Sequence, residues 1–195
     1  MDRIVLASGN AGKLRELSRA LLPLGVELLP LSDFTSTQAE ETGLSYVENA
    51  LIKARHAADA SGLPALADDS GLSVDALGGA PGVYSARYAG PEADDAANRA
   101  KLLQALAEQP QRTAAFHCVL ALVRSAQDPL PRIAQGHWAG EILRAERGDG
   151  GFGYDPVFFD PDLGLSAAEM NPETKQARSH RGHAVRQLLD QLRRA

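Results

Sequence analysis

The spacing of apolar residues along the chain predicts helices that alternate with strands from one end to the other. In three segments apolar residues recur every three or four positions, which is the pattern of a helix with one buried face, and residues 93–107 have the composition of a helix. Ser45 and Glu48 have the spacing of a capping box and mark the start of the second of these helices. The predicted helices cover residues 14–22, 45–60, 93–107 and 179–192.

Short aliphatic and β-branched runs predict the strands that lie between these helices. Because helices and strands interleave, the pattern favours an α/β protein. Consecutive strands between residues 113 and 143 indicate hairpins, and therefore a mixed sheet rather than a purely parallel one. The predicted strands cover residues 3–7, 26–29, 63–67, 72–77, 113–123, 132–138, 141–143 and 157–159.

Length, charge and cysteine content narrow the class of protein. The chain has 195 residues, enough for one large domain, and its net charge of −5 lacks the basic character of a general DNA or RNA binder. The single cysteine, Cys118, excludes a disulfide within the chain and lies in an apolar run, which indicates a core residue. No apolar run approaches the roughly 20 residues that cross a bilayer, so we expect a soluble cytoplasmic protein without a membrane partner.

A glycine-containing segment lies between the first predicted strand and the first predicted helix. Small residues allow backbone amides to approach an anion, and a helix N-terminus adds a partial positive charge. Lys13 lies in the first helical turn, where a cation is unfavourable unless an anion is nearby. The pattern is not a Walker A loop, because Leu14 follows the lysine. A phosphate-binding loop and a plain turn both stay open for Ser8, Gly9, Asn10, Ala11, Gly12 and Lys13.

Two pairs of acidic residues are candidates for metal binding and acid–base chemistry. Glu40 and Glu41 lie in a predicted loop, and Asp68 and Asp69 directly follow a predicted apolar strand. Open α/β sheets place their sites at the carboxyl ends of strands, and carboxylate oxygens suit Mg²⁺. Most such pairs are solvated surface acids, but the preceding apolar run predicts that at least one aspartate is half buried. Asp69 is therefore the candidate for a functional carboxylate.

The glycine-rich segment over residues 148–153 formally matches the dinucleotide-binding pattern G-x-G-x-x-G. A predicted strand follows it where that fold needs a helix, so the dinucleotide interpretation fails. The segment instead indicates a loop that presents Phe152 and Tyr154. Their rings either stack on a nucleotide base or pack into the core.

The C-terminal segment is basic although the chain as a whole is acidic. Residues 173–195 contain six basic residues and two acidic ones. Lys175, His180 and Arg181 offer hydrogen-bond donors near the start of the last predicted helix, where cations are unfavourable. These side chains are either solvated or placed there to meet an acceptor on a ligand.

Several short motifs follow one another along the whole chain. They are SGNAGK at residues 8–13, EETG at 40–43, ENALIKAR at 48–55, ADDSGL at 67–72, LGGAPGVYSARY at 77–88, GGFGYDPVF at 150–158 and SHRG at 179–182. In this order and at this spacing, the motifs resemble the inosine triphosphate pyrophosphatase family, which degrades non-canonical purine nucleoside triphosphates.

The resemblance implies an elongated α/β fold in which residues 1–195 form a single two-lobed domain. A long mixed central sheet flanked by helices and a cleft between the lobes are implied with it. The family resemblance also implies a homodimer that depends on Mg²⁺. The implied reaction cleaves ITP, dITP or XTP between the α and β phosphates, which gives a nucleoside monophosphate and pyrophosphate and cleanses the nucleotide pool.

The resemblance, together with the residue chemistry, assigns roles within this site. Asp69 would be the general base on the attacking water and a Mg²⁺ ligand, with Glu41 and Glu40 as further metal-side carboxylates. Residues 8–13 and Lys53 would hold the triphosphate. Further substrate contacts, to the base and its 6-oxygen above all, would come from Ser70, Phe152, Gly153, Tyr154, Asp155, Lys175, His180 and Arg181.

Three alternatives stay open at this point. A related pyrophosphatase could act on modified pyrimidines, although Phe152 and the pair His180-Arg181 favour purines. A regulatory module would bind nucleotides without cleaving them, and the acidic pair Asp68-Asp69 speaks against it. A nucleic-acid binder would show salt-dependent affinity for DNA or RNA, which the negative net charge disfavours.

Overall fold

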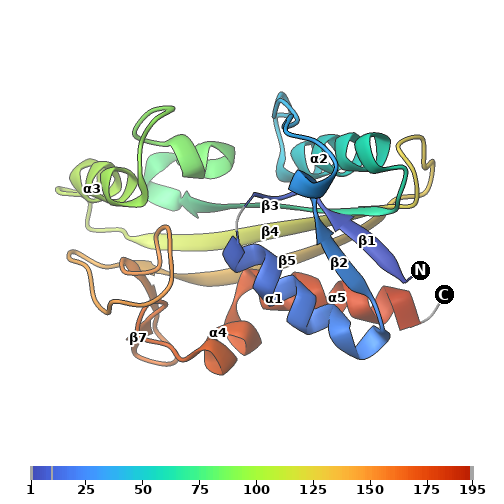
Figure 1. The fold of residues 1–195 in the computed structure, drawn as a ribbon. Helices are drawn as coiled ribbons and strands as arrows, with labels where there is room; N and C mark the ends of the chain where they lie inside the picture. Colours follow the sequence, from blue (N-terminus) through green and yellow to red (C-terminus); the bar gives the residue numbers. More distant parts are fainter. Residues whose placement is uncertain (1, 10, 194–195) are drawn as a thin grey trace. The chain divides into compact units, whose positions relative to one another are not determined.

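A computed structural model describes residues 2–9 and 11–193 and shows a mixed β-sheet flanked by helices (Figure 1). In this part of the chain the strands are hydrogen-bonded in the order β2-β1-β3-β4-β5-β6-β7. β1 runs parallel to β2 and β3, whereas β6 runs antiparallel to β5 and β7. The predicted α/β class and mixed sheet are confirmed. The elements are β1 Arg3–Leu6, α1 Ala11–Leu21, β2 Glu27–Pro30, α2 Tyr46–Ser61, β3 Ala65–Val74, α3 Asp95–Ala105, β4 Thr113–Val123, β5 Arg132–Ile142, β6 Phe158–Asp160, β7 Leu165–Ser166, α4 Pro172–Arg178 and α5 His180–Arg193.

The chain divides into two compact units, and β3, β4 and β5 each contribute residues to both. The first unit comprises residues 1–69, 118–136 and 184–195, and the second comprises residues 70–117 and 137–183. Each unit buries its own apolar side chains. The cleft and the elongated shape stay predictions.

In the first unit helices cover both faces of the sheet. Side chains of α1 and α5 pack on one face around Leu66 and Leu120, while α2 packs on the other face around Ala67 and Val119 (Figure 1). Successive residues of a strand point to opposite faces, which is why neighbours in β3 belong to different clusters. Completely buried alanines on α2 allow this helix to approach the sheet closely.

The capping box predicted for α2 is confirmed. The hydroxyl of Ser45 accepts a hydrogen bond from the Glu48 backbone amide, and the Glu48 carboxylate accepts hydrogen bonds from the Ser45 hydroxyl and the Leu44 amide. These bonds lower the pKa of Glu48. Gly62 ends the helix in the left-handed conformation, with a φ of 67°. Among the described helices, none is long and apolar enough to span a membrane.

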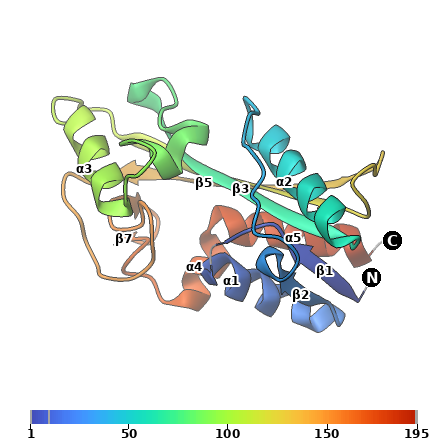
Figure 2. The same cartoon turned by 45° about the horizontal axis from the view of Figure 1, so that its top comes forward.

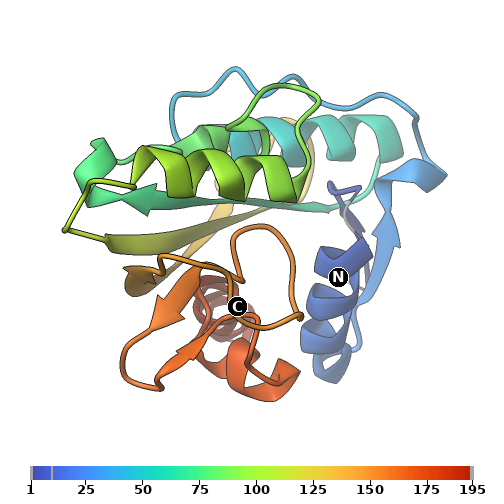
Figure 3. The ribbon, with the colours of Figure 1, turned by 90° about the vertical axis from the view of Figure 1, so that its left-hand side faces the viewer.

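The second unit is built around an aromatic core. Phe116, Trp138 and Phe158 pack against one another with ring centroids between 4.5 and 6.2 Å apart, and Leu102 of α3 belongs to the same cluster. Figure 3 shows α3 alongside the end of β3. The Trp138 indole donates a hydrogen bond to the buried carboxylate of Asp160 at 2.9 Å. This polar pair fixes β5 against β6 inside an otherwise apolar cluster.

Side chains of α5 bind backbone groups of β5. In the first unit Gln187 accepts a hydrogen bond from the Gln135 amide, and Gln191 donates one to the Ile133 carbonyl at 2.8 Å. In the second unit His183 Nδ1 lies 2.8 Å from the carbonyl oxygen of His137. Unpaired backbone groups along a strand are costly and promote aggregation, so this row of side chains protects β5.

The structure corrects the predicted boundaries at several points. Residues 63–67 and 72–77 were predicted as separate strands, but β3 is one continuous strand whose last predicted residues instead form a 3₁₀ turn, Asp75–Leu77. β5 is likewise one strand rather than two. The short elements α4 and β7 carry too few residues for a periodic pattern and were not predicted. The polar residues within β3 resemble a turn in the sequence, but they find charged partners on both faces of the sheet.

Candidate active site

β3 carries two adjacent aspartates beyond the end of β1. The pairing of β1 with β3 ends at Leu6 and Leu66, so both aspartates lie beyond the paired part of β1. Asp68 and Asp69 are only 1% and 7% exposed, which confirms the predicted burial. The prediction that they end their own strand is wrong, because they lie in the middle of β3. They do follow the carboxyl end of the parallel strand β1, where α/β sheets place their sites.

The two aspartates face opposite sides of the sheet. Asp68 forms an ion pair with Lys13 of α1, and its other oxygen accepts a hydrogen bond from the Cys118 thiol at 3.3 Å. Asp68 is thus the anion that a lysine in the first turn of a helix requires. Cys118 is buried, as predicted, but its contact with a site carboxylate was not predicted.

On the other face Asp69 forms a group with Lys53 of α2 and Glu41. The Lys53 ammonium lies 2.6 Å from Oδ1 of Asp69 and 2.9 Å from a carboxylate oxygen of Glu41. Burial raises the pKa of Asp69 and outweighs the attraction of Lys53, while the charges of Glu41 and Asp68 raise it further. Burial alone would lower the pKa of Lys53, but its two acidic partners raise it. The group therefore holds a buried carboxylate with increased proton affinity beside a permanent cation.

The loop that carries Glu41 is held by Asn49, one turn before Lys53 on α2. The Asn49 side chain is 1% exposed, and its Oδ1 accepts a hydrogen bond from the Gly43 amide at 2.8 Å. A Cβ at Gly43 would lie 2.6 Å from the Cβ of Glu48, so only glycine allows this close contact. Nearby, burial and the charge of Asp69 raise the pKa of Tyr46 to about 12.

The carboxylates of this group suit Mg²⁺. Oδ2 of Asp69 is buried and makes no hydrogen bond to any described residue, and Glu41 shares the same ammonium. Within the described chain no three acidic, histidine or cysteine side chains form a ready-made metal site. Mg²⁺ does not need one, because it commonly binds one or two carboxylates together with substrate phosphates. Glu40 is exposed, and in the described part of the chain it makes no side-chain contact with this group.

The predicted strand and helix on either side of the glycine-containing segment are confirmed. Ser8 and Gly9 follow β1, and Gly12 and Lys13 lie in the first turn of α1. Asn10 lies outside the described residues. The backbone amides at the start of α1 and the Lys13 ammonium are therefore close in sequence to β1, in the arrangement that suits an anion.

In the second unit the predicted aromatic loop presents Phe152. This residue is 39% exposed, and its backbone amide donates a hydrogen bond to Asp155 at 2.7 Å. Asp155 also accepts a hydrogen bond from the Lys175 ammonium at 2.5 Å. The ring of Phe152 lies 5.1 Å from that ammonium and 5.7 Å from the guanidinium of Arg181. The half-exposed ring of Phe152 thus lies near two cations. This arrangement suits a base, which could stack on the ring and accept hydrogen bonds from the cations.

The other predicted base contacts divide between this group and the core. Arg181 is 6% exposed, and its guanidinium lies 3.5 Å from the Ser70 hydroxyl. His180 instead stacks on Phe116, with ring centroids 4.7 Å apart. The Tyr154 side chain is buried, and its hydroxyl donates to the Ser85 carbonyl at 2.8 Å. The structure therefore brings Ser70, Phe152, Asp155, Lys175 and Arg181 together, while Tyr154 anchors the loop.

Three residues of these groups were not predicted from the sequence. Asn49 lies on the polar face of α2 with Lys53, but nothing in the sequence shows that it binds the loop of Glu41. Asp95 and Arg99 of α3 contact the backbone of Gly153. Their spacing of four is ordinary on a helix, so the sequence contains no signal for this contact.

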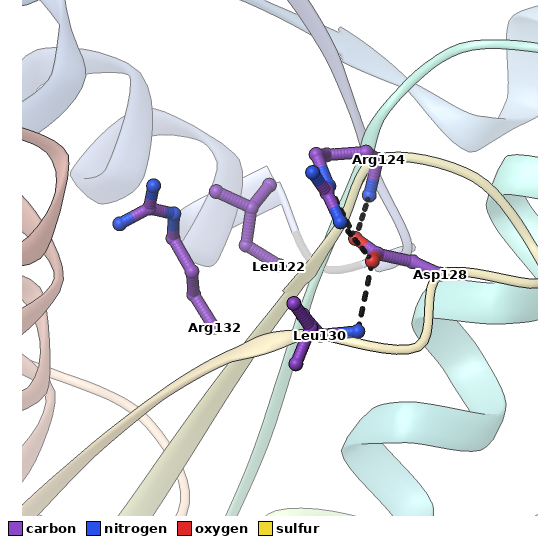
Figure 4. A pocket seen from close by; sticks show the side chains of 5 residues that line it. All are labelled: Leu122, Arg124, Asp128, Leu130 and Arg132. Carbon is purple, nitrogen blue, oxygen red and sulfur yellow. Dashed lines mark hydrogen bonds and ion pairs between the residues drawn. The ribbon is translucent and has the colours of Figure 1, made fainter. Parts of the chain in front are cut away.

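A cavity of about 190 Å³ lies elsewhere, at the end of the hairpin formed by β4 and β5. Figure 4 shows that Arg124 and Asp128 form a two-pronged ion pair there, while Arg132 points away from it. Asp128 also accepts a hydrogen bond from the Leu130 amide. The Arg124 side chain and the backbone amides of Arg124 and Leu130 lower the pKa of Asp128. The Asp128 carboxylate thus already has hydrogen-bond partners within the hairpin. We therefore assign the cavity a structural role rather than a role in ligand binding.

Fold and side-chain chemistry together define an α/β protein with groups suited to a triphosphate and to a base. The chain belongs to the Ham1 family, whose model matches residues 4–191. It is 55% identical over 197 residues to the dITP/XTP pyrophosphatase of Pectobacterium atrosepticum, with all of both chains covered. It is 59% identical over 192 residues to that of Thioalkalivibrio sulfidiphilus, covering 97% of this chain and 98% of the relative. A solved structure of a HAM1 protein from Coxiella burnetii is 52% identical, covers all of both chains and has a TM-score of 0.94. The family resemblance of the motifs is confirmed.

Proposed function

We propose that this chain hydrolyses dITP, XTP and ITP to the nucleoside monophosphate and pyrophosphate and so removes non-canonical purines from the nucleotide pool. The observation that carries the proposal is the group of Asp69, Lys53 and Glu41, in which a buried carboxylate of raised pKa lies beside a cation. The full-length similarity to dITP/XTP pyrophosphatases supports the substrate class. The chain is thus proposed to be a hydrolase of the α–β phosphoanhydride.

The first unit supplies the chemistry for the triphosphate. Asp68 and Asp69 hold the ammonium groups of Lys13 and Lys53, and the amides of Ala11 and Gly12 lie at the N-terminus of α1. Backbone amides and a helix N-terminus favour an anion, and the two lysines would offset part of the triphosphate charge.

Asp69 is the proposed general base. Its Oδ2 makes no hydrogen bond to a described residue, so this oxygen can accept a proton from water. The water oxygen bonds to the α-phosphorus while the bond to the bridging oxygen breaks, pyrophosphate leaves with that oxygen, and the proton passes to Asp69. A raised pKa makes the carboxylate a better acceptor, and general-base catalysis contributes about 10²–10⁴-fold. Mg²⁺ held by Asp69 and Glu41 would supply positive charge against the phosphates.

The second unit supplies recognition of the base. Phe152 would stack on the purine, and Lys175 and Arg181 would donate hydrogen bonds to its 6-oxygen. Adenine carries a donor at this position, and such a mismatch in a buried polar site discriminates by about 10⁴-fold or more. Guanine also carries a 6-oxygen, so its rejection must involve the 2-position.

The proposal includes the assembly and location that the family resemblance implies. The chain would act as a homodimer in the cytoplasm, and it would bind no nucleic-acid polymer. Sedimentation equilibrium of the purified chain measures the assembly directly, and a mass of one chain at all concentrations would contradict the dimer.

The experiment that tests the function is pyrophosphate release from a panel of nucleoside triphosphates, with and without Mg²⁺. We expect release from dITP, XTP and ITP that depends on Mg²⁺, with the monophosphate as the second product. Release of inorganic phosphate would contradict cleavage between the α and β phosphates. Tight binding without any product would indicate a regulatory module, and a preference for modified pyrimidines would overturn the substrate class.

A further inference from the structure

Two residues of α3 hold the loop that carries Phe152. Asp95 and Arg99 lie four positions apart, so their side chains leave the same face of the helix. Asp95 accepts a hydrogen bond from the backbone amide of Gly153 at 2.7 Å, and Arg99 donates one to the Gly153 carbonyl oxygen at 2.9 Å. Both backbone polar groups of one residue are therefore bound by one helix, beside which the loop passes in Figure 2.

These contacts lie where the loop has its greatest conformational freedom. Gly153 has a φ of +60°, a left-handed conformation that glycine adopts without strain. Gly148, Gly150 and Gly151 precede it in the same segment, so the free chain has many accessible conformations. Binding both polar groups of Gly153 removes much of this freedom before any ligand arrives.

The helix that provides these contacts is itself firmly anchored. The Arg99 side chain is 15% exposed, and its Nε donates a second hydrogen bond to Glu146 at 2.8 Å. Asn98, only 2% exposed, accepts a hydrogen bond from the Ala89 amide at 2.7 Å and donates one to the Ala86 carbonyl at 3.1 Å. Buried hydrogen bonds of Asn98 therefore hold α3 in place beside the loop.

We propose that Asp95 and Arg99, together the α3 clip, are positioning residues that hold Phe152 and Asp155 ready for the purine base. The inference rests on the proposed function, because it concerns the base-binding group of that site. The clip acts through Gly153, the residue directly after Phe152. In the same loop Asp155 accepts hydrogen bonds from the Phe152 amide and from the Lys175 ammonium. A loop that is ordered in advance lowers the entropy cost of binding.

The test measures kcat and KM for dITP together with hydrogen exchange of the Gly153 amide in the ligand-free protein. In Arg99→Ala we expect KM to rise about tenfold while kcat changes less than about threefold, because the loop must then be ordered when the nucleotide binds, which weakens binding of the substrate and the transition state equally. Asp95→Ala should raise KM less, since Asp95 is exposed, and should speed exchange of the Gly153 amide. Asp95→Asn keeps an acceptor oxygen and should restore KM, as Arg99→Lys should in part.

The control is Lys101→Ala, which removes a cation from the same helix. Lys101 contacts the carbonyl and ring of Tyr88 rather than Gly153, so KM should stay at the wild-type value. Unchanged exchange in Asp95→Ala, or faster exchange with unchanged KM in both alanine variants, would overturn the clip. A wild-type chain that releases no pyrophosphate from dITP would instead overturn the proposed function, so the two failures are distinguishable.

Discussion

The two units hold their functional groups in different ways. In the first unit Asp68, Asp69, Lys13 and Lys53 all lie in regular elements, and each ammonium pairs with an aspartate. In the second unit Phe152 lies in a glycine-rich loop that backbone hydrogen bonds hold to α3 and to its own acidic residue.

Under the proposed function, this difference matches what each group would recognise. A triphosphate has the same shape and charge in every nucleotide, so charges fixed on helices and strands suit it. The base group adds Phe152 of a loop to Lys175 and Arg181 of α4 and α5, and a loop can be adjusted in sequence without disturbing a core. We therefore expect changes in the first unit to act on kcat and changes in the second to act on KM and selectivity.

The largest effect expected is that of Asp69→Asn on the chemical step. Asparagine cannot accept a proton from water, so kcat for dITP should fall by about 10²–10⁴-fold while KM changes little. Steady-state pyrophosphate release measures both constants. Asp59→Asn is the control, because Asp59 is an exposed aspartate of α2 in the same unit. Near-wild-type turnover of Asp69→Asn would remove Asp69 as the base.

The next largest effect expected is that of Phe152→Ala, which should act on KM rather than on kcat. Phe152→Ala removes the ring that would stack on the base, and since stacking contributes about 1–3 kcal/mol per base, KM should rise about 5–150-fold. The effect on kcat should be much smaller. Leu163→Ala truncates an apolar side chain of similar exposure, 40%, and should leave KM unchanged. A fall in kcat alone for Phe152→Ala would contradict the division of roles.

Asp160→Asn tests how much the buried carboxylate stabilises the second unit. The Asp160 carboxylate accepts hydrogen bonds from Trp138 and Arg178. Asparagine would bring its own NH2 donor against these two donors. The free energy of unfolding should therefore fall by about 1–3 kcal/mol. Urea denaturation measures the loss. Asp162→Asn is the control, because it contacts the same guanidinium but is exposed. An equal loss in both variants would contradict a special role for the buried carboxylate.

The pH dependence of that loss follows from the pKa of Asp160. Burial opposes ionisation, but the hydrogen bonds of Trp138 and Arg178 outweigh it and lower the pKa below its ordinary value of 3.8. Because the pKa is lower in the folded state, the ionised carboxylate stabilises the folded protein at every pH above the unfolded-state pKa, which is near 4. This stabilisation is lost as the pH falls through the folded-state pKa. The difference between wild type and Asp160→Asn should therefore be constant near neutral pH and shrink below about pH 4.

The smallest effect is expected at the hairpin cavity. Arg124→Ala breaks the ion pair with Asp128 but touches neither functional group, so kcat/KM for dITP should stay within about twofold of wild type. A larger drop would show that the hairpin takes part in function.

The sequence predicted the regular parts of the site and missed its supports. The capping box of α2 and the burial of Asp68 and Asp69 are confirmed, because local periodicity and apolar neighbours determine both. The interruption predicted within β3 is wrong, because Lys13 and Lys53 satisfy its aspartates from distant parts of the chain. No local pattern reveals partners that are far apart in sequence.

The same reasoning explains why the helix residues that hold the loops were not predicted from the sequence. The contacts of Asn49 with Gly43 and of Arg99 with Gly153 join a helix side chain to a backbone group. Any residue has a backbone amide and carbonyl, so such contacts leave no mark in the composition of the loop. His180 was predicted at the base, and the structure stacks it on Phe116, a partner that only the folded core provides.

The central claim is that this chain cleaves triphosphates to pyrophosphate and selects the base by its 6-position. The most direct measurement mixes equal concentrations of dITP and dATP with the wild-type chain and Mg²⁺ and follows both monophosphates. The ratio of initial rates equals the ratio of the two kcat/KM values, and we expect dIMP to form at least about 10⁴-fold faster than dAMP. Equal rates for the two nucleotides would contradict the account.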